Sequence, residues 1–287
     1  MSVKGSDYAK EIAHLASTAL REEAQLTPKP GLVDRRGSGS HTDMTLSLFE
    51  KSATVLEATF FEIALASFGQ KIDSSLRSRV GALGRAGENR MLLTTGGVNT
   101  HRGAIWTLGL LCAAAASLKG EIHDEKELLS TAAALAAIAD PALVGVNLTS
   151  HGSTVLVRYK KTGAREEAQA GFPHIAKAGL PTLRSSLASG ASFCVAAVNA
   201  LLSIMATLSD TCVLTRAGLE GLDLTQKGAA RILALGGFGT KAGEAAYRDY
   251  EKQIREMNIS PGGAADLLAG TFFVDRLLKM PVLTSEK

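Results

Sequence analysis

Apolar residues recur every three or four positions along almost the whole chain, and this spacing constrains the fold more than any other feature. Strict two-residue alternation, the sign of a half-exposed strand, occurs only over residues 153–159. The helical stretches are 8–25, 42–66, 73–93, 104–118, 125–138, 183–208, 222–235, 240–257 and 264–280. The pattern predicts an all-α protein with about ten helices. We find no Ser/Gly-rich linker and no internal repeat, so we expect a single domain over residues 1–287.

Composition and charge exclude several classes of protein. At 46% hydrophobic residues the chain can bury a large core, which excludes a disordered protein. A net charge of +3 over 287 residues is too weak to indicate a nucleic-acid partner. The longest uncharged run, residues 185–209, contains many Ser, Thr and Asn side chains, so we expect buried helices and no membrane span.

Three cysteines, Cys112, Cys194 and Cys212, are too few and too scattered for a disulfide framework or a zinc cluster. Their apolar surroundings predict buried free thiols. The first residues are polar and lack the apolar stretch of a signal peptide. Together these features predict a cytoplasmic protein.

Local signals mark several helix ends. Asp124 precedes an acidic first turn, and Asp140-Pro141 is typical of a helix end. Ser260-Pro261 reads as an N-cap followed by a proline in the first turn.

Residues 27–44 are the densest polar segment of the chain. Two prolines are followed by cations, two carboxylates, a histidine and several small residues. A long loop of this kind in a helical protein is usually functional. Lys and Arg neutralise phosphate oxygens and Asp binds hydrated Mg²⁺, so the composition suits a phosphate–metal site. The alternative is a solvated surface loop in which Asp43 caps the next helix.

Two further glycine-containing segments begin helices. In residues 94–104, Asn99 or Thr100 can cap the following helix and leave His101 and Arg102 at its positive end, where an anion can bind. Residues 260–266 form a similar helix start, for which simple capping is the alternative. The P-loop, H-E-x-x-H, C-x-x-C and G-x-S-x-G motifs are all missing from the sequence.

Taken in order, these segments resemble the triphosphoribosyl-dephospho-CoA synthases. The resemblance extends from residue 27 to about residue 278 and lies in five segments: Thr27–Asp34 with His41–Met44, Gly97–Ile105, Gly163–Ala168 with Gly171–Pro173, Asp210-Thr211, and Ser260–Leu268. It implies an all-helical enzyme that joins ATP to 3′-dephospho-CoA and releases adenine. Cys212 and Ala264 depart from the family pattern, which puts a hydrogen-bonding role at position 212 in doubt.

The resemblance also implies roles for particular residues. The reaction displaces adenine from a sugar C1, so carboxylates and an acid–base pair are needed beside it, together with cations and Mg²⁺ for the triphosphate. We expect the catalytic residues to be Asp34, His41, Asp43 and Glu166, with Asp34 and Asp43 also binding Mg²⁺. We expect the substrate-binding residues to be Lys29, Arg35, Asn99, His101, Arg102, Arg165, Ser260, Gly262, Gly263 and Asp266.

Several alternatives remain open from sequence. The run 37–41, Trp106 and the Ala-rich character resemble the stand-alone version that serves malonate decarboxylase, with the version that serves citrate lyase as the alternative. The resemblance further implies a partner that loads the product onto an acyl-carrier protein, and allows a homodimer. A non-catalytic nucleotide or CoA sensor and a helical ADP-ribose-type hydrolase are the competing functions.

Overall fold

The chain folds into helices connected by short turns and one long loop. The computed structural model describes residues 3–143 and 163–280, and these ranges contain eleven α-helices and no β-strand. The all-α prediction with about ten helices is therefore confirmed. The helices are α1 (Val3–Gln25), α2 (Leu46–Ser67), α3 (Ser74–Thr94), α4 (Arg102–Ser117), α5 (Glu125–Ala137), α7 (Ala164–Gln169), α8 (Leu180–Ala188), α9 (Phe193–Met205), α10 (Thr211–Ala234), α11 (Lys241–Glu256) and α12 (Gly262–Leu277).

Two predicted helix boundaries were wrong, both because of a glycine. The helix predicted over 183–208 is divided into α8 and α9 by a turn at Gly190, whose φ of 85° suits glycine. The helix predicted over 222–235 begins earlier, at Thr211, and contains a kink at Gly218 with φ of 63°. The possible strand at 153–159 lies outside the described residues.

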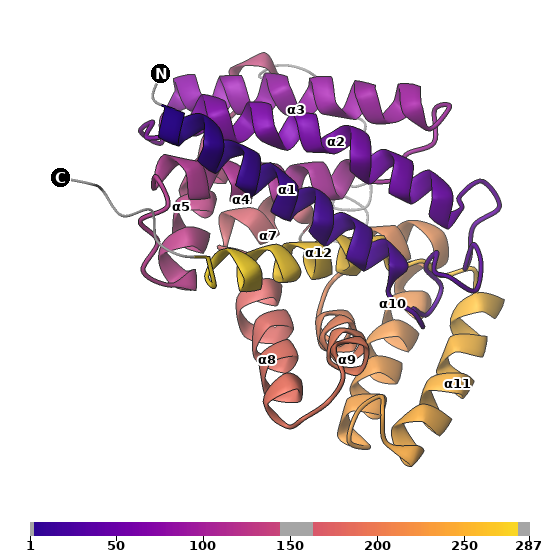
Figure 1. Ribbon diagram of the computed structural model, residues 1–287. Helices are drawn as coiled ribbons and strands as arrows, with labels where there is room; N and C mark the ends of the chain where they lie inside the picture. The colour runs from indigo at the N-terminus through magenta and orange to yellow at the C-terminus, as the bar shows by residue number, and fades with distance from the viewer. Residues whose placement is uncertain (1–2, 144–162, 281–287) are drawn as a thin grey trace.

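Helix α4 is the centre of the core. Its Ala113–Ala116 run is completely buried, and small side chains there let neighbouring helices approach closely. It packs against α1, α2, α3, α5 and α12. Figure 1 shows α2 and α3 above this centre and α1 crossing in front of it.

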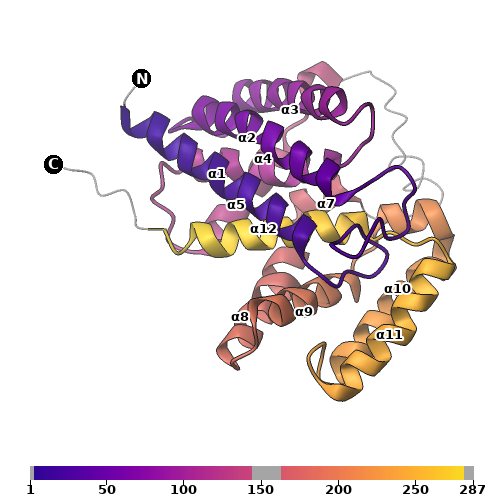
Figure 2. The ribbon, with the colours of Figure 1, turned by 45° about the vertical axis from the view of Figure 1, so that its right-hand side comes forward.

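Helix α12 separates the two sides of the molecule. In both views α8, α9, α10 and α11 lie on the opposite side of α12 from α2 and α3 (Figures 1 and 2). The long loop between α1 and α2 lies where these two sides meet, beside the first turn of α12 and the ends of α10 and α11 (Figure 2). The motifs at residues 27–44 and 260–266 are thereby brought together.

The start of α12 is not capped as the sequence suggested. Pro261 is the N-cap residue and makes no side-chain cap bond, so the expected capping by Ser260 is wrong. The cap comes from Asp210, whose carboxylate accepts the Ala264 amide at 2.9 Å and the Cys212 amide at 2.8 Å. One buried carboxylate therefore holds the starts of α10 and α12 together.

Other local predictions have mixed outcomes. Asp124 caps α5 as expected, but Thr45 and not Asp43 caps α2. Cys112 is buried, whereas Cys194 and Cys212 are exposed, so the expectation of three buried thiols was wrong for two of them. Among the described residues, no helix is long and apolar enough to cross a membrane.

We predict that Asp210→Ala destabilises the fold more than the loss of an ordinary cap. Three amides, those of Cys212, Val213 and Ala264, lose a buried acceptor, so the free energy of unfolding should fall by about 2–4 kcal/mol. The matched control is Asp73→Ala, which removes the exposed cap of α3 and should cost about 1 kcal/mol. Urea unfolding followed by circular dichroism measures both, and equal losses would contradict the double-cap assignment.

Candidate functional site

A buried ion pair connects the end of α1 to the loop that follows it. Lys29 Nζ donates to Glu23 Oε1 at 2.6 Å and to the Glu23 carbonyl oxygen, also at 2.6 Å. The two side chains are only 2% and 5% exposed. Burial of this kind is maintained only when each charge has a partner. In this structure Lys29 is therefore engaged inside the protein and does not present its charge to solvent.

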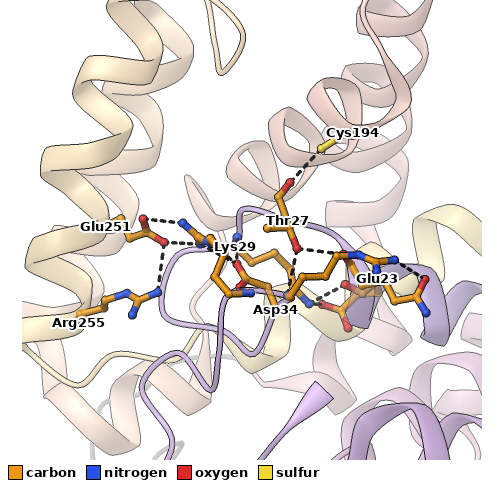
Figure 3. A network of polar contacts seen from close by, with 10 residues as sticks. Glu23, Thr27, Lys29, Asp34, Cys194, Glu251 and Arg255 are labelled. Carbon is orange, nitrogen blue, oxygen red and sulfur yellow. Dashed lines mark hydrogen bonds and ion pairs between the residues drawn. The ribbon is translucent and has the colours of Figure 1, made fainter. Parts of the chain in front are cut away.

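Asp34 anchors the next part of the loop. Its Oδ2 accepts the Lys29 amide at 3.0 Å and Arg36 Nη2 at 2.6 Å, while Oδ1 accepts the Arg36 amide at 2.7 Å. Arg36 also pairs with Glu251 of α11, which lies 3.7 Å from Arg255 (Figure 3). The carboxylate is thus used to fix the loop against α11.

Arg35 and Thr27 make further contacts within the protein. Arg35 donates to the carbonyl and the side chain of Gln25 at 3.2 and 3.0 Å. The Cys194 thiol donates to the Thr27 carbonyl oxygen at 3.0 Å, which ties the loop to α9 (Figure 3). The loop is therefore held on three sides by α1, α9 and α11.

His101, at the start of α4, has a defined tautomer. Thr100 Oγ1 donates to Ser52 Oγ at 2.8 Å, which leaves the Ser52 hydroxyl hydrogen for His101 Nδ1 at 2.7 Å. Nδ1 is therefore an acceptor, and the neutral ring carries its proton on Nε2. Burial, aided by the charge of Lys29, lowers the pKa of His101 to about 3.

The Nε2–H group of His101 has no hydrogen-bond partner within the described ranges, although it is buried. Buried polar groups are almost always paired, so an unpaired donor of this kind needs an explanation. A neutral donor at a helix start suits an oxygen of a ligand.

Asp266, just after the first turn of α12, is directed at the start of α4. The Asp266 carboxyl lies against Gly103, so closely that a Cβ added to Gly103 would be only 1.9 Å from Asp266 Oδ2. The same carboxyl accepts a hydrogen bond from the Ala104 amide. Dense packing of protein around the carboxyl, followed by the charges of Glu23 and Asp210, raises the pKa of Asp266 well above its usual range. Carboxyl groups with such pKa values gather at functional sites because catalysis requires a proton donor near neutral pH.

We call Glu23, Lys29, His101 and Asp266 the α4-start cluster. Three of these were expected from sequence as separate substrate-binding residues, and the structure brings them together. Lys29 and Glu23 act electrostatically on His101 and Asp266, respectively. The cluster therefore combines a neutral donor, a carboxyl whose pKa is raised by dense packing and nearby carboxylates, and a buried ion pair.

His41 and Ser260 form a neighbouring group. His41 Nδ1 accepts from Arg216 Nη2 at 3.0 Å, and its Nε2–H donates to Ser260 Oγ at 2.8 Å. Burial, followed by the charge of Arg216, lowers the pKa of His41. Because both ring nitrogens are engaged, His41 here fixes the loop against α12. Asp43 is 60% exposed, with its Oδ1 3.9 Å from His41 Nδ1.

Four more of the predicted residues lie at the start of α4 and on α7. Asn99 Oδ1 accepts the Arg102 amide at 3.1 Å, while the Arg102 side chain pairs with Glu88. Arg165 is exposed on α7, and Glu166 there accepts the Gly163 amide at 2.9 Å.

Gly262 and Gly263 permit a close approach between helix starts. A Cβ on Gly263 would lie 3.1 Å from an Asp210 oxygen, and one on Gly262 would lie 3.1 Å from Cys212 Sγ. These glycines shape the backbone around Asp210 and Asp266.

Sequence reasoning missed Glu23, Ser52 and Arg216. Glu23 lies in the last turn of a helix and Ser52 in the middle of one, so neither belongs to a motif. A serine on a mainly apolar helix face was the one signal available for Ser52. Arg216 gave no local signal, because its contacts with Ser40 and Asn258 are far apart in sequence.

The expected Mg²⁺ ligands do not form a metal site as placed here. The Asp34 carboxylate is taken up by the Arg36 side chain and two backbone amides, and Asp43 is exposed in another part of the loop. Among the described residues, no group of three or more His, Cys, Asp and Glu side chains is suited to hold a metal. The assignment of Asp34 and Asp43 to Mg²⁺ stays a prediction that this geometry does not support.

Comparison with known proteins places these features in a family context. Residues 9–283 match the family described as ATP:dephospho-CoA triphosphoribosyl transferase. A 2-(5″-triphosphoribosyl)-3′-dephosphocoenzyme-A synthase of Klebsiella pneumoniae is 51% identical over 93% of this chain and 94% of its own length. Proteins named probable synthases of the same kind from Azotobacter vinelandii and Stutzerimonas stutzeri are 51% and 50% identical over 95% and 94% of this chain, and over 93% and 92% of their own. No solved structure matches the chain.

We predict that Asp266→Asn stabilises the protein at neutral pH. The pKa of Asp266 is higher in the folded protein than in the unfolded chain, where it is about 3.9. Between these two pKa values the native state binds more protons than the unfolded state, so the free energy of unfolding falls as the pH rises. Asparagine removes this cost and keeps an acceptor for the Ala104 amide. The melting temperature of the variant should therefore exceed that of the parent at pH 7.5, with a smaller difference at pH 4. A lower melting temperature at pH 7.5 would contradict this assignment.

Proposed function

Because this chain belongs to the ATP:dephospho-CoA triphosphoribosyl transferase family and is therefore a transferase, we propose that the α4-start cluster carries out its reaction. The proposed reaction joins ATP to 3′-dephospho-CoA and releases adenine. The observation that carries the assignment is that the buried Nε2–H of His101, which has no partner among the described residues, and the Asp266 carboxyl, whose pKa is raised, lie at the same helix start. Few structural roles require both groups in the same place.

The proposed chemistry is a displacement at a sugar carbon. A bond forms between the 2′-oxygen of dephospho-CoA and C1′ of the ATP ribose, and the bond from C1′ to adenine breaks. The hydroxyl loses a proton and the departing adenine gains one. Such reactions pass through oxocarbenium-like charge, so a proton donor at the leaving group lowers the barrier.

Asp266 is suited to be that donor. Its raised pKa keeps the carboxyl protonated at a pH where ordinary aspartates are ionised, and the proton lost by the hydroxyl balances the one it gives. The Ala104 amide orients the group. Asp266 thus supplies the proton that leaving adenine takes up.

His101 acts as a fixed neutral hydrogen-bond donor in this proposal. Its Nε2–H is directed to a substrate oxygen, and Ser52 is a positioning residue that maintains the tautomer. A pKa of about 3 prevents the ring from taking up a proton during the reaction, so it binds but does not exchange protons. Mg²⁺ enters only as part of the ATP substrate.

We further propose that the product is the prosthetic-group precursor of malonate decarboxylase. The support is the resemblance of the run 37–41 and of Trp106 to the stand-alone version of the family. A loading enzyme would then transfer the product to the acyl-carrier protein. The test is whether the product, with such an enzyme, reactivates apo malonate decarboxylase and not apo citrate lyase.

We predict that the protein releases adenine only when both substrates are present. With ATP, Mg²⁺ and dephospho-CoA, chromatography should show adenine and the joined product in equal amounts. CoA should be a poor acceptor, because its 3′-phosphate adds bulk and charge beside the attacking hydroxyl. Adenine release without an acceptor would indicate a hydrolase, and ATP binding without adenine release would indicate a sensor.

We predict that His101→Asn lowers kcat/KM by about 10- to 150-fold, the value of a hydrogen bond to a charged group. Asparagine can replace Nδ1 toward Ser52 but cannot reach the position of Nε2, whereas His101→Gln can and should lose less. The control is His123→Asn, at an exposed histidine that pairs with Glu127. Parent-like kinetics for His101→Asn, with its melting temperature unchanged, would remove His101 from the site.

A further inference from the structure

A cavity of about 200 Å³ lies between α3 and α4, and no residue of the α4-start cluster lines it. Its walls are mainly aliphatic and include Ile63, Val80, Ile105 and Leu110. Arg102, at its edge, is the residue next to His101. The cavity and the proposed site of reaction therefore share the first turn of α4.

The cavity holds an arginine whose hydrogen bonding is incomplete. Arg77 is 5% exposed, and its Nε has no hydrogen-bond partner in the part of the chain that the structure describes. Its Nη1 lies 3.4 Å from Asp140, and its guanidinium carbon lies 5.4 Å from the centre of the Trp106 ring. An unpaired donor on a buried cation is costly, and a ligand oxygen in the cavity would satisfy it.

Two further arginines lie at the mouth, where they are more exposed. The Arg85 side chain is 40% exposed and pairs with Asp140 at 2.6 Å. The Arg102 side chain is 50% exposed and pairs with Glu88. Three arginines face two carboxylates, so the lining has a net charge of +1. This suits a ligand with an apolar part inside and phosphates at the mouth.

Glycine keeps the interior open. Gly84, in the middle of α3, lines the cavity, and a Cβ there would have Ile105 Cγ2 at 3.9 Å as its nearest neighbour. Glycine within a helix costs about 1 kcal/mol relative to alanine, and no close contact requires it at this position. The open space beside Gly84 is available to a ligand.

We propose that this cavity binds the pantetheine arm of dephospho-CoA, with the diphosphate of the same molecule at Arg85 and Arg102; this rests on the proposed function. Of the two substrates, only dephospho-CoA has a long arm, with methyl and methylene groups beside its amides, joined to a diphosphate. Arg77 Nε donates to a carbonyl oxygen of the arm. A diphosphate at Arg102 places the attached ribose, with its 2′-hydroxyl, toward His101 and Asp266. The cavity thereby distinguishes the acceptor from the donor nucleotide.

Trp106 makes the proposal directly measurable. It is the single tryptophan of the chain, it lines the cavity, and its Nε1 is fixed to the Ala164 carbonyl oxygen at 3.1 Å. Titration of the parent protein with dephospho-CoA or with 4′-phosphopantetheine should change tryptophan fluorescence in a saturable way. MgATP alone should leave it unchanged. No change with phosphopantetheine, or an equal change with MgATP, would overturn the proposal.

A cavity-filling variant provides the kinetic test. Gly84→Leu should raise the KM for dephospho-CoA at least about tenfold, a loss of about 1.4 kcal/mol in binding, while the KM for MgATP stays near that of the parent. It should also abolish the response of Trp106 to phosphopantetheine. The control is Ala82→Leu on the exposed side of α3, which should behave as the parent does. An unchanged KM for dephospho-CoA in a folded Gly84→Leu protein contradicts the proposal.

These experiments distinguish a failure of the proposed function from a failure of the proposed binding in the cavity. The fluorescence titrations of the parent use one ligand at a time, so they need neither catalysis nor a folded variant. Absence of adenine release would overturn the proposed function and leave the titration with phosphopantetheine as the test of the cavity. A normal reaction with no fluorescence response would overturn the cavity alone.

Discussion

The buried ion pair between Lys29 and Glu23 is the interaction on which the rest of the site depends. It holds the long loop against the end of α1, and its two charges act on the two groups to which we assign the chemistry. The ammonium helps to lower the pKa of His101, and the carboxylate helps to raise the pKa of Asp266. Breaking a buried pair by removing one partner costs about 3–5 kcal/mol, so the site and the fold share this constraint.

A second constraint is the convergence of helix starts. Asp210 holds α10 and α12 together, and Asp266 of α12 reaches the first turn of α4. Helix starts carry unpaired amides and partial positive charge, which favour carboxylates nearby. Burial works in the opposite direction and raises the pKa of both aspartates. Burial of ionisable groups lowers the free energy of unfolding, and such a loss of stability is typical of catalytic sites.

Most of the fold could be predicted from the sequence because apolar spacing is strong along α1, α2, α3, α4, α5, α11 and α12. The error at Gly190 arose because a helical pattern continues across a glycine whose backbone leaves the helical region. At Gly218 the error was the opposite: the helix was predicted to begin only after the kink, whereas α10 begins at Thr211. The α12 cap could not be predicted, because Asp210 lies 54 residues before the amide of Ala264 that it accepts. Long-range partners leave no local signal.

The candidate site was predicted in part, for a related reason. Residue types identified His101 and Asp266, but the charges in the loop were expected to face phosphate and Mg²⁺. In the structure Lys29 and Asp34 are paired within the protein instead. Sequence shows that charged residues are close along the chain, but only packing decides whether they face one another or a ligand. Ser52, which sets the tautomer of His101, depends on such packing.

The state of the His101 ring tests the account most directly. Long-range ¹H–¹⁵N NMR spectra of protein labelled at its six histidines report the tautomer and the charge of each ring. We expect His101 to remain neutral with its proton on Nε2 between pH 5 and 8, and its Nε2 signal to shift when MgATP and the joined product are added. A ring that titrates near pH 6.5, or an Nε2 signal that neither ligand moves, would contradict the assignment of the start of α4 as the site of reaction.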